Sequence, residues 1–129
     1  MLIRKKLFGL NELNEAIASV ISGVERERKL SEEQEYRIRL VLSELVVNIF
    51  KYSDADEVRL EAEHGPEGLH IALKDNGGGF ESTPYVERNV TTQEFLMHEN
   101  GRGVYLVRMM TDSLTYSESG NAVDVTLKL

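Results

Sequence analysis

Residues 38–50 have the sequence IRLVLSELVVNIF, a predominantly apolar run. In a helix, these side chains would cover nearly every side, which is typical of a helix buried by more than one neighbour. Ser31 followed three residues later by Gln34 is a capping box, so the helix is predicted to begin there and to run to about Tyr52. The stretch therefore predicts a central helix around which a domain packs.

Four polar residues interrupt the apolar run, and two of them share a side of the helix. Glu44 and Asn48 are predicted to lie one turn apart, because residues four positions apart occupy the same helix face. A carboxylate and a carboxamide beside a buried stripe need hydrogen-bond or metal partners, since burial of an unpaired polar group is costly. The alternative is a solvated face, and the pair alone does not distinguish the two.

The segments on either side of this helix predict an α+β domain. Apolar residues at helical spacing predict one helix over 10–24 and another over 104–110. Alternation and β-favouring composition predict strands, of which the second and third would form a hairpin connected by residues 64–68. The predicted fold is a two-layer sandwich with about three helices on one face of a mainly antiparallel mixed sheet. The predicted strands are residues 2–8, 58–63, 69–74, 113–118 and 123–129.

Size and composition favour one domain and limit its partners. With 129 residues, 41% of them hydrophobic, the chain fits a single domain over 1–129. Its net charge of -7 argues against nucleic acid or an acidic membrane as a partner, because phosphate groups are bound mainly by clustered Lys and Arg. The absence of Cys excludes disulfides and thiolate chemistry, and with no apolar run of membrane-spanning length it favours a cytoplasmic location.

Two glycine clusters follow the predicted hairpin. In Asp75-Asn76-Gly77-Gly78-Gly79-Phe80 the acid continues the core-facing phase of its strand, and the glycines would let the backbone approach a ligand closely. Gly101-Arg102-Gly103 is predicted to open a helix whose free N–H groups and guanidinium suit a phosphate. A simple turn and a hinge are the respective alternatives. Residues 76–100 show no periodicity, and so long a loop is uncommon unless it is functional.

In their order along the chain, these motifs resemble the Bergerat ATP-binding superfamily of gyrase and the histidine kinases. The pattern is Glu-x-x-x-Asn on a helix, then Asp-x-Gly-x-Gly-Phe after a strand, then Gly-x-Gly at a helix start. The resemblance implies ATP and Mg²⁺ as cofactors, with Asn48 completing the coordination of the metal and Asp75 binding adenine. The loop that precedes the second glycine cluster would be the ATP lid. The implied nucleotide-binding residues are Asn48, Lys51, Asp75, Gly77, Gly79, Gly101, Arg102, Gly103 and Val104.

Within that superfamily, the chain resembles the stand-alone serine kinases that act as anti-sigma factors, although Tyr52 and Asn121 stand where these kinases usually carry His and Thr. The resemblance implies that Glu44 activates a Ser or Thr hydroxyl on an anti-anti-sigma-type protein, that a sigma factor is sequestered, and that the chain forms a homodimer. One alternative is an ATP-binding module without catalysis. A second alternative is a histidine-kinase-type domain that acts with another chain. Histidine kinases need a phosphoacceptor His upstream of this helix, and all three histidines of this chain follow the Glu44 helix, which disfavours this alternative.

Overall fold

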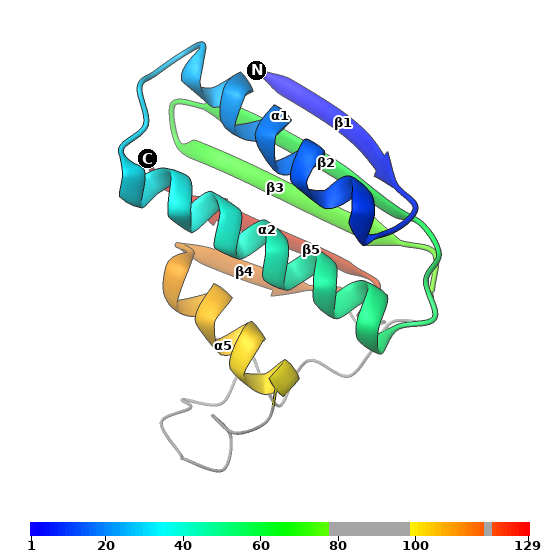
Figure 1. Cartoon of the computed structure of the whole chain (residues 1–129). Helices are drawn as coiled ribbons and strands as arrows, with labels where there is room; N and C mark the ends of the chain where they lie inside the picture. Colours follow the sequence, from blue (N-terminus) through cyan, green and yellow to red (C-terminus); the bar gives the residue numbers. More distant parts are fainter. Residues whose placement is uncertain (78–98, 118–119) are drawn as a thin grey trace.

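A computed structural model describes residues 1–77, 99–117 and 120–129, with the backbone alone at 99–104. Among the described residues, one sheet and three α-helices build the fold (Figure 1). The elements in chain order are β1 (Leu2–Leu7), the short 3-10 helix η1 (Leu10–Glu12), α1 (Leu13–Glu25), α2 (Glu32–Tyr52), β2 (Val58–Gly65), β3 (Gly68–Asp75), α5 (Glu99–Met110), β4 (Ser113–Tyr116) and β5 (Ala122–Leu127).

The sheet has the strand order β1-β2-β3-β5-β4, and every described pair of neighbouring strands is antiparallel. In the β2–β3 hairpin, Val58 pairs with Asp75 and Leu60 pairs with Leu73. Alternate side chains point to opposite faces of a sheet, so these residues all lie on the buried face. The predicted α+β sandwich is confirmed, and its described strands form an antiparallel rather than a mixed sheet.

The three helices α1, α2 and α5 lie on one face of the sheet, with α2 between the other two (Figure 1). The predicted capping box is present, because Ser31 Oγ accepts from Gln34 N at 3.1 Å and Gln34 Oε1 accepts from Ser31 N at 2.9 Å. The buried residues of α2 face the sheet and both neighbouring helices, as predicted for a central helix. They are Ile38, Val41, Leu42, Leu45, Val46, Asn48 and Ile49.

The predicted bounds of the hairpin turn, of the helix α5 and of the last two strands differ from the structure, and long-range pairing and packing account for the first two. The hairpin turn consists of Pro66 and Glu67 alone, because strand pairing continues to Gly65 and Gly68. The helix α5 begins at Glu99, so the second glycine cluster lies inside its first turns instead of opening it. Glycine is a poor helix former, but packing against α2 stabilises a helix beyond its local propensity. The last two strands end at Tyr116 and Leu127.

The C-terminal end of α5 is bound to α2. Arg37, on α2, donates hydrogen bonds from Nε and Nη2 to the carbonyl oxygen of Met110, at 3.2 and 2.8 Å. Such contacts satisfy carbonyl groups that a helix end leaves without intrahelical partners. In the part of the chain that the structure describes, no helix has both the length and the apolar character needed to cross a lipid bilayer.

The hairpin provides a test of the backbone geometry. Gly68 has a φ of 120°, which side chains disfavour, and a Cβ atom there would overlap the carbonyl oxygen of Leu127. Gly65, which pairs with Gly68, has open space at the corresponding position. We expect Gly68→Ala to lower the free energy of unfolding by about 1–3 kcal/mol, and Gly65→Ala to lower it much less. Urea denaturation measures both, and equal losses would contradict the assigned turn geometry.

Candidate functional site

Two elements that end on the same side of the molecule, α2 and β3, carry four of the predicted site residues: Glu44, Asn48, Lys51 and Asp75. Figure 1 shows that α2 and β3 run in the same direction across the fold and end close to one edge. The turn over residues 53–57 connects α2 to β2, whose first residue, Val58, pairs with Asp75. Antiparallel pairing therefore brings this turn next to the end of β3. In addition, Asp75 N donates to the carbonyl oxygen of Asn121 at 2.9 Å, which joins β3 to the segment that precedes β5.

Asn48 is one of two buried polar residues in the described core, with only 4% of its surface exposed. Its Nδ2 atom has no hydrogen-bond partner within the described part of the protein. An unsatisfied buried amide costs on the order of 1–3 kcal/mol, so its place in an apolar helix calls for a partner. Glu44, one turn earlier on α2, is half-buried. Asn48 therefore does not lie on a solvent-exposed face of the helix.

Asp75 is the second buried polar residue, with 5% of its surface exposed, and it lies on the core side as predicted. It has hydrogen-bond partners within the chain. Its Oδ1 atom accepts from Gly77 N at 2.7 Å, and the Ser53 side chain also forms a hydrogen bond with it. Burial raises the pKa of the Asp75 carboxyl and is the largest effect. The negative charge of Asp54 also raises this pKa, whereas the two hydrogen bonds lower it. A carboxylate has about four acceptor sites, so Asp75 retains capacity for a further donor.

Gly77 packs tightly against the turn that follows α2. A Cβ atom on this residue would lie 2.5 Å from Ser53 Oγ, 2.6 Å from Asp54 Oδ1 and 2.9 Å from Ala55 N. Any side chain would push the turn away and disturb the hydrogen bond from Gly77 N to Asp75. The first glycine of the motif therefore allows close approach of two parts of this chain, whereas the sequence suggested approach to a ligand.

The remaining predicted residues are placed less fully. Lys51 is exposed in the last turn of α2, with its Nζ atom 5.3 Å from the centroid of the Tyr52 ring. Gly79 lies outside the described residues, as does most of the predicted lid. Four more are placed only by the backbone of α5: Gly101, Arg102, Gly103 and Val104.

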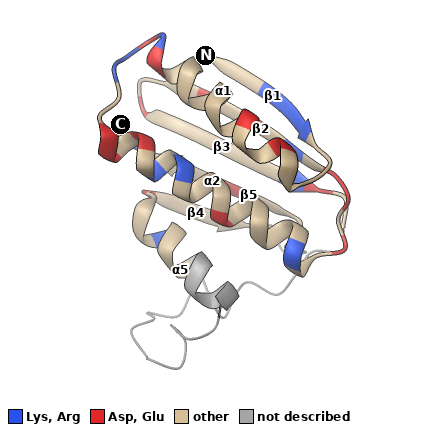
Figure 2. Cartoon of the chain, viewed as in Figure 1, with Lys and Arg blue, Asp and Glu red and all other residues tan. Residues whose placement is uncertain are grey.

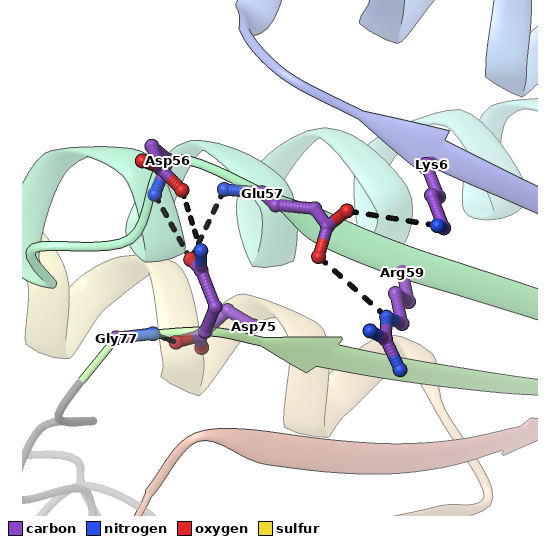
Figure 3. A network of polar contacts seen from close by, with 7 residues as sticks. Lys6, Asp56, Glu57, Arg59, Asp75 and Gly77 are labelled. Carbon is purple, nitrogen blue, oxygen red and sulfur yellow. Dashed lines mark hydrogen bonds and ion pairs between the residues drawn. The ribbon is translucent and has the colours of Figure 1, made fainter.

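Asn76, beside Asp75, makes contacts that the sequence does not indicate. Its Oδ1 atom accepts hydrogen bonds from the backbone N of Asp56 at 3.0 Å and of Glu57 at 3.1 Å (Figure 3). Its Nδ2 atom donates to Asp56 Oδ1, and its backbone N donates to the carbonyl oxygen of Glu57 at 3.3 Å. Asn is common in turns for local reasons. These partners are about 20 residues away, so only the folded hairpin reveals them.

A separate hollow lies on the face of the sheet that the described helices leave open. It has a volume of about 560 Å³, and its lining includes Ala72, Ala122, Arg59 and Lys74. None of the predicted site residues contributes to it. The exposed positions of the strands alternate with the buried positions that face the helices. The hollow and the predicted site therefore lie on different faces of the sheet.

A buried carboxamide on a central helix and a buried carboxylate at the end of the neighbouring hairpin suit a site for a polar small molecule. Comparison with known families identifies the class, because residues 10–127 match the model of the histidine kinase-like ATPase domain. The chain belongs to this family. Membership implies ATP binding, typically with Mg²⁺. A search of curated proteins found no significant match.

The buried carboxyl of Asp75 predicts a dependence of stability on pH. Its pKa is raised in the folded protein, so the folded state holds this proton more tightly than the unfolded state. The free energy of unfolding should therefore fall as pH rises from the ordinary aspartate pKa through the raised value, and ionisation then costs stability at neutral pH. We expect nucleotide-free Asp75→Asn, which does not titrate, to lack this fall.

Urea denaturation between about pH 4 and about pH 7 measures the difference. Glu67→Gln, in the exposed hairpin turn, is the control for net charge. The same pH dependence in wild type and Asp75→Asn would show that burial of this carboxyl has no energetic consequence.

Proposed function

We propose that this chain is an ATP- and Mg²⁺-dependent serine/threonine protein kinase of the anti-sigma-factor type. Its substrate would be an anti-anti-sigma-type protein, and its second partner would be a sigma factor that it sequesters. The family match supports the ATP-binding part of this proposal. The single observation that favours a catalytic site is the unsatisfied carboxamide of Asn48, one turn from the half-buried Glu44.

Asn48 fits the role of a metal ligand. Its carboxamide is buried and has one end without a partner, and a half-turn of the amide presents either the nitrogen or the oxygen. A neutral amide oxygen is a hard ligand that suits Mg²⁺, which keeps most of its other positions for phosphate oxygens and water. Bound Mg²⁺ would supply charge neutralisation at the phosphates. Asn48 would orient the triphosphate relative to α2.

Glu44 fits the role of general base in this proposal. It is half-buried and lies on α2 one turn before Asn48, so part of the residue remains accessible to a substrate. The substrate oxygen would form a bond to the γ-phosphorus while the bond from that phosphorus to the ADP oxygen breaks. Glu44 would accept the proton that the hydroxyl loses. Positioning and electrostatics account for most catalysis in phosphoryl transfer, which suits a site with few reactive groups.

Asp75 fits the role of adenine acceptor. Its carboxylate is buried, and two local hydrogen bonds leave part of its acceptor capacity unused. The amino group of adenine is a donor, whereas guanine carries a carbonyl acceptor at the same position. Two facing acceptors in a buried site are unfavourable, so the site would select ATP over GTP.

A second candidate function is an ATP-binding partner-switch module without catalysis. The same buried residues would then serve to bind nucleotide, and nucleotide would only stabilise the form of the chain that its partners recognise. This candidate shares the nucleotide site with the kinase and differs in the need for Glu44. A histidine-kinase-type domain that acts with another chain shares the same site and would need a phosphoacceptor His on that chain.

The nucleotide assignment predicts selective binding. With Mg²⁺ present, we expect ATP to bind at least about 100-fold more tightly than GTP, and Asp75→Asn to lose most of the ATP affinity. Asp124→Asn, on the helix-free face, should bind as wild type does. Isothermal titration calorimetry measures each affinity. Equal affinity of the wild type for ATP and GTP would exclude Asp75 as the adenine acceptor.

The catalytic assignment predicts different losses for two neighbours on α2. We expect Asn48→Ala to weaken MgATP binding, and Glu44→Ala to leave affinity within a few-fold while slowing phosphotransfer by about 10²–10⁴-fold. Glu33→Ala, in the exposed first turn of the same helix, is the matched control. Phosphate transfer from radiolabelled ATP to a co-purifying or co-encoded anti-anti-sigma-type protein measures the rate.

Two outcomes would decide against parts of this proposal. A wild-type protein that binds ATP and a partner tightly, yet transfers no phosphate to it, would favour the module without catalysis. A Glu44→Ala protein that phosphorylates its partner at the wild-type rate would leave a kinase with a different general base.

A further inference from the structure

Asn76 joins two segments that are far apart in the sequence and adjacent at the site. Its side chain accepts two backbone hydrogen bonds from the turn after α2 and donates one to Asp56, and its backbone bonds to Glu57. These hydrogen bonds of Asn76 are all with residues 56 and 57 of the same chain.

The neighbours of Asn76 in the chain are the two residues whose geometry defines the proposed adenine contact. Asp75 precedes it, and Gly77, which follows it, donates from N to Asp75 Oδ1 at 2.7 Å. Gly77 in turn packs against the same turn that Asn76 binds. The position of the carboxylate thus depends on how firmly residues 75–77 are held against residues 53–57.

We propose that Asn76 is a positioning residue that fixes the Asp75 carboxylate against the turn after α2, and that it thereby sets the preference for ATP over GTP. This inference rests on the proposed nucleotide site. Discrimination between a donor and an acceptor on the base requires an acceptor of fixed position and restricted access to water. If residues 75–77 move away from the turn, the carboxylate can rotate or bind water, and guanine is no longer strongly rejected.

The ion pairs of Glu57 in the same network do not fix the position of the Asp75 carboxylate. Glu57 lies 3.9 Å from Lys6 Nζ and 3.6 Å from Arg59 Nε, and both cationic side chains are largely exposed. Exposed ion pairs of this kind contribute little to stability, because water and salt screen them. Figure 2 shows the cationic end of β1 near this region, and its Lys6 contributes the 3.9 Å ion pair with Glu57. Arg59→Gln is therefore a matched control within the network.

The first experiment compares nucleotide selectivity in three proteins. Calorimetry with MgATP and MgGTP should show about 10-fold weaker ATP binding for Asn76→Ala, with GTP binding changed less, so that the affinity ratio shrinks. Arg59→Gln should keep the wild-type ratio. A residue with a merely structural role would lower both affinities equally. An unchanged ATP/GTP ratio in Asn76→Ala overturns the proposal.

The second experiment exchanges the hydrogen-bonding roles of two side chains. Asn76→Asp alone places a carboxylate beside that of Asp56, and we expect it to reduce the ATP/GTP ratio as Asn76→Ala does. The double variant Asn76→Asp with Asp56→Asn restores a donor and an acceptor at this contact, with the net charge of the wild type. We expect the double variant to regain most of the ratio. Failure of this rescue, in a double variant that melts at the wild-type temperature, overturns the proposal.

Amide hydrogen exchange in nucleotide-free protein tests the contact independently of function. Asn76→Ala should speed exchange at the amides of Asp56, Glu57 and Gly77 by about 10-fold or more, whereas Arg59→Gln should not. Unchanged exchange at these amides overturns the positioning role. A wild type without preference for ATP would instead refute the adenine assignment, and that single measurement separates failure of the proposed function from failure of this inference.

Discussion

The antiparallel pairing of β2 with β3 begins at Val58 and Asp75, and the rest of the site depends on this register. It places the Asp75 carboxylate on the helix-covered face and the turn after α2 beside it. Because side chains alternate across a strand, a shift by one residue would turn Asp75 to the open face and remove the apolar residues of β3 from the core. The hydrophobic effect on Leu69, Ile71 and Leu73 therefore holds a polar group in position.

Two polar side chains are buried in the described core, and each lies among the otherwise apolar buried residues of its element. Asn48 lacks a partner at one atom, and burial raises the pKa of the Asp75 carboxyl. Both buried polar groups reduce the stability of the fold, and both lie on well-supported elements. The helix α2 is capped at Ser31 and packed on both sides, and β3 is a central strand. Rigid support of strained polar groups is typical of binding sites that are organised before the ligand arrives.

Much of the fold could be predicted because its signals are local. The capping box at Ser31, the alternation in the hairpin and the apolar helix 38–50 each indicate their element within a few residues, and the structure confirms them. The start of α5 and the length of the hairpin turn could not be predicted, because pairing and packing with distant residues extend these elements beyond their local preferences. Glu44, Asn48 and Asp75 were found as candidates because polar residues in apolar patterns are conspicuous.

By itself, the sequence determined that the chain has one central helix, a buried-face hairpin and a pair of polar positions that demand partners, since periodicity and capping depend on neighbours along the chain. Only the tertiary structure decided which contacts those positions make. Asp75 forms hydrogen bonds with Gly77 and Ser53. The turn after α2 leaves no room for a side chain at Gly77, and Asn76 forms hydrogen bonds with the same turn. Hydrogen bonds and close packing join residues by distance in space, and for residues about 20 positions apart only the folded chain sets that distance.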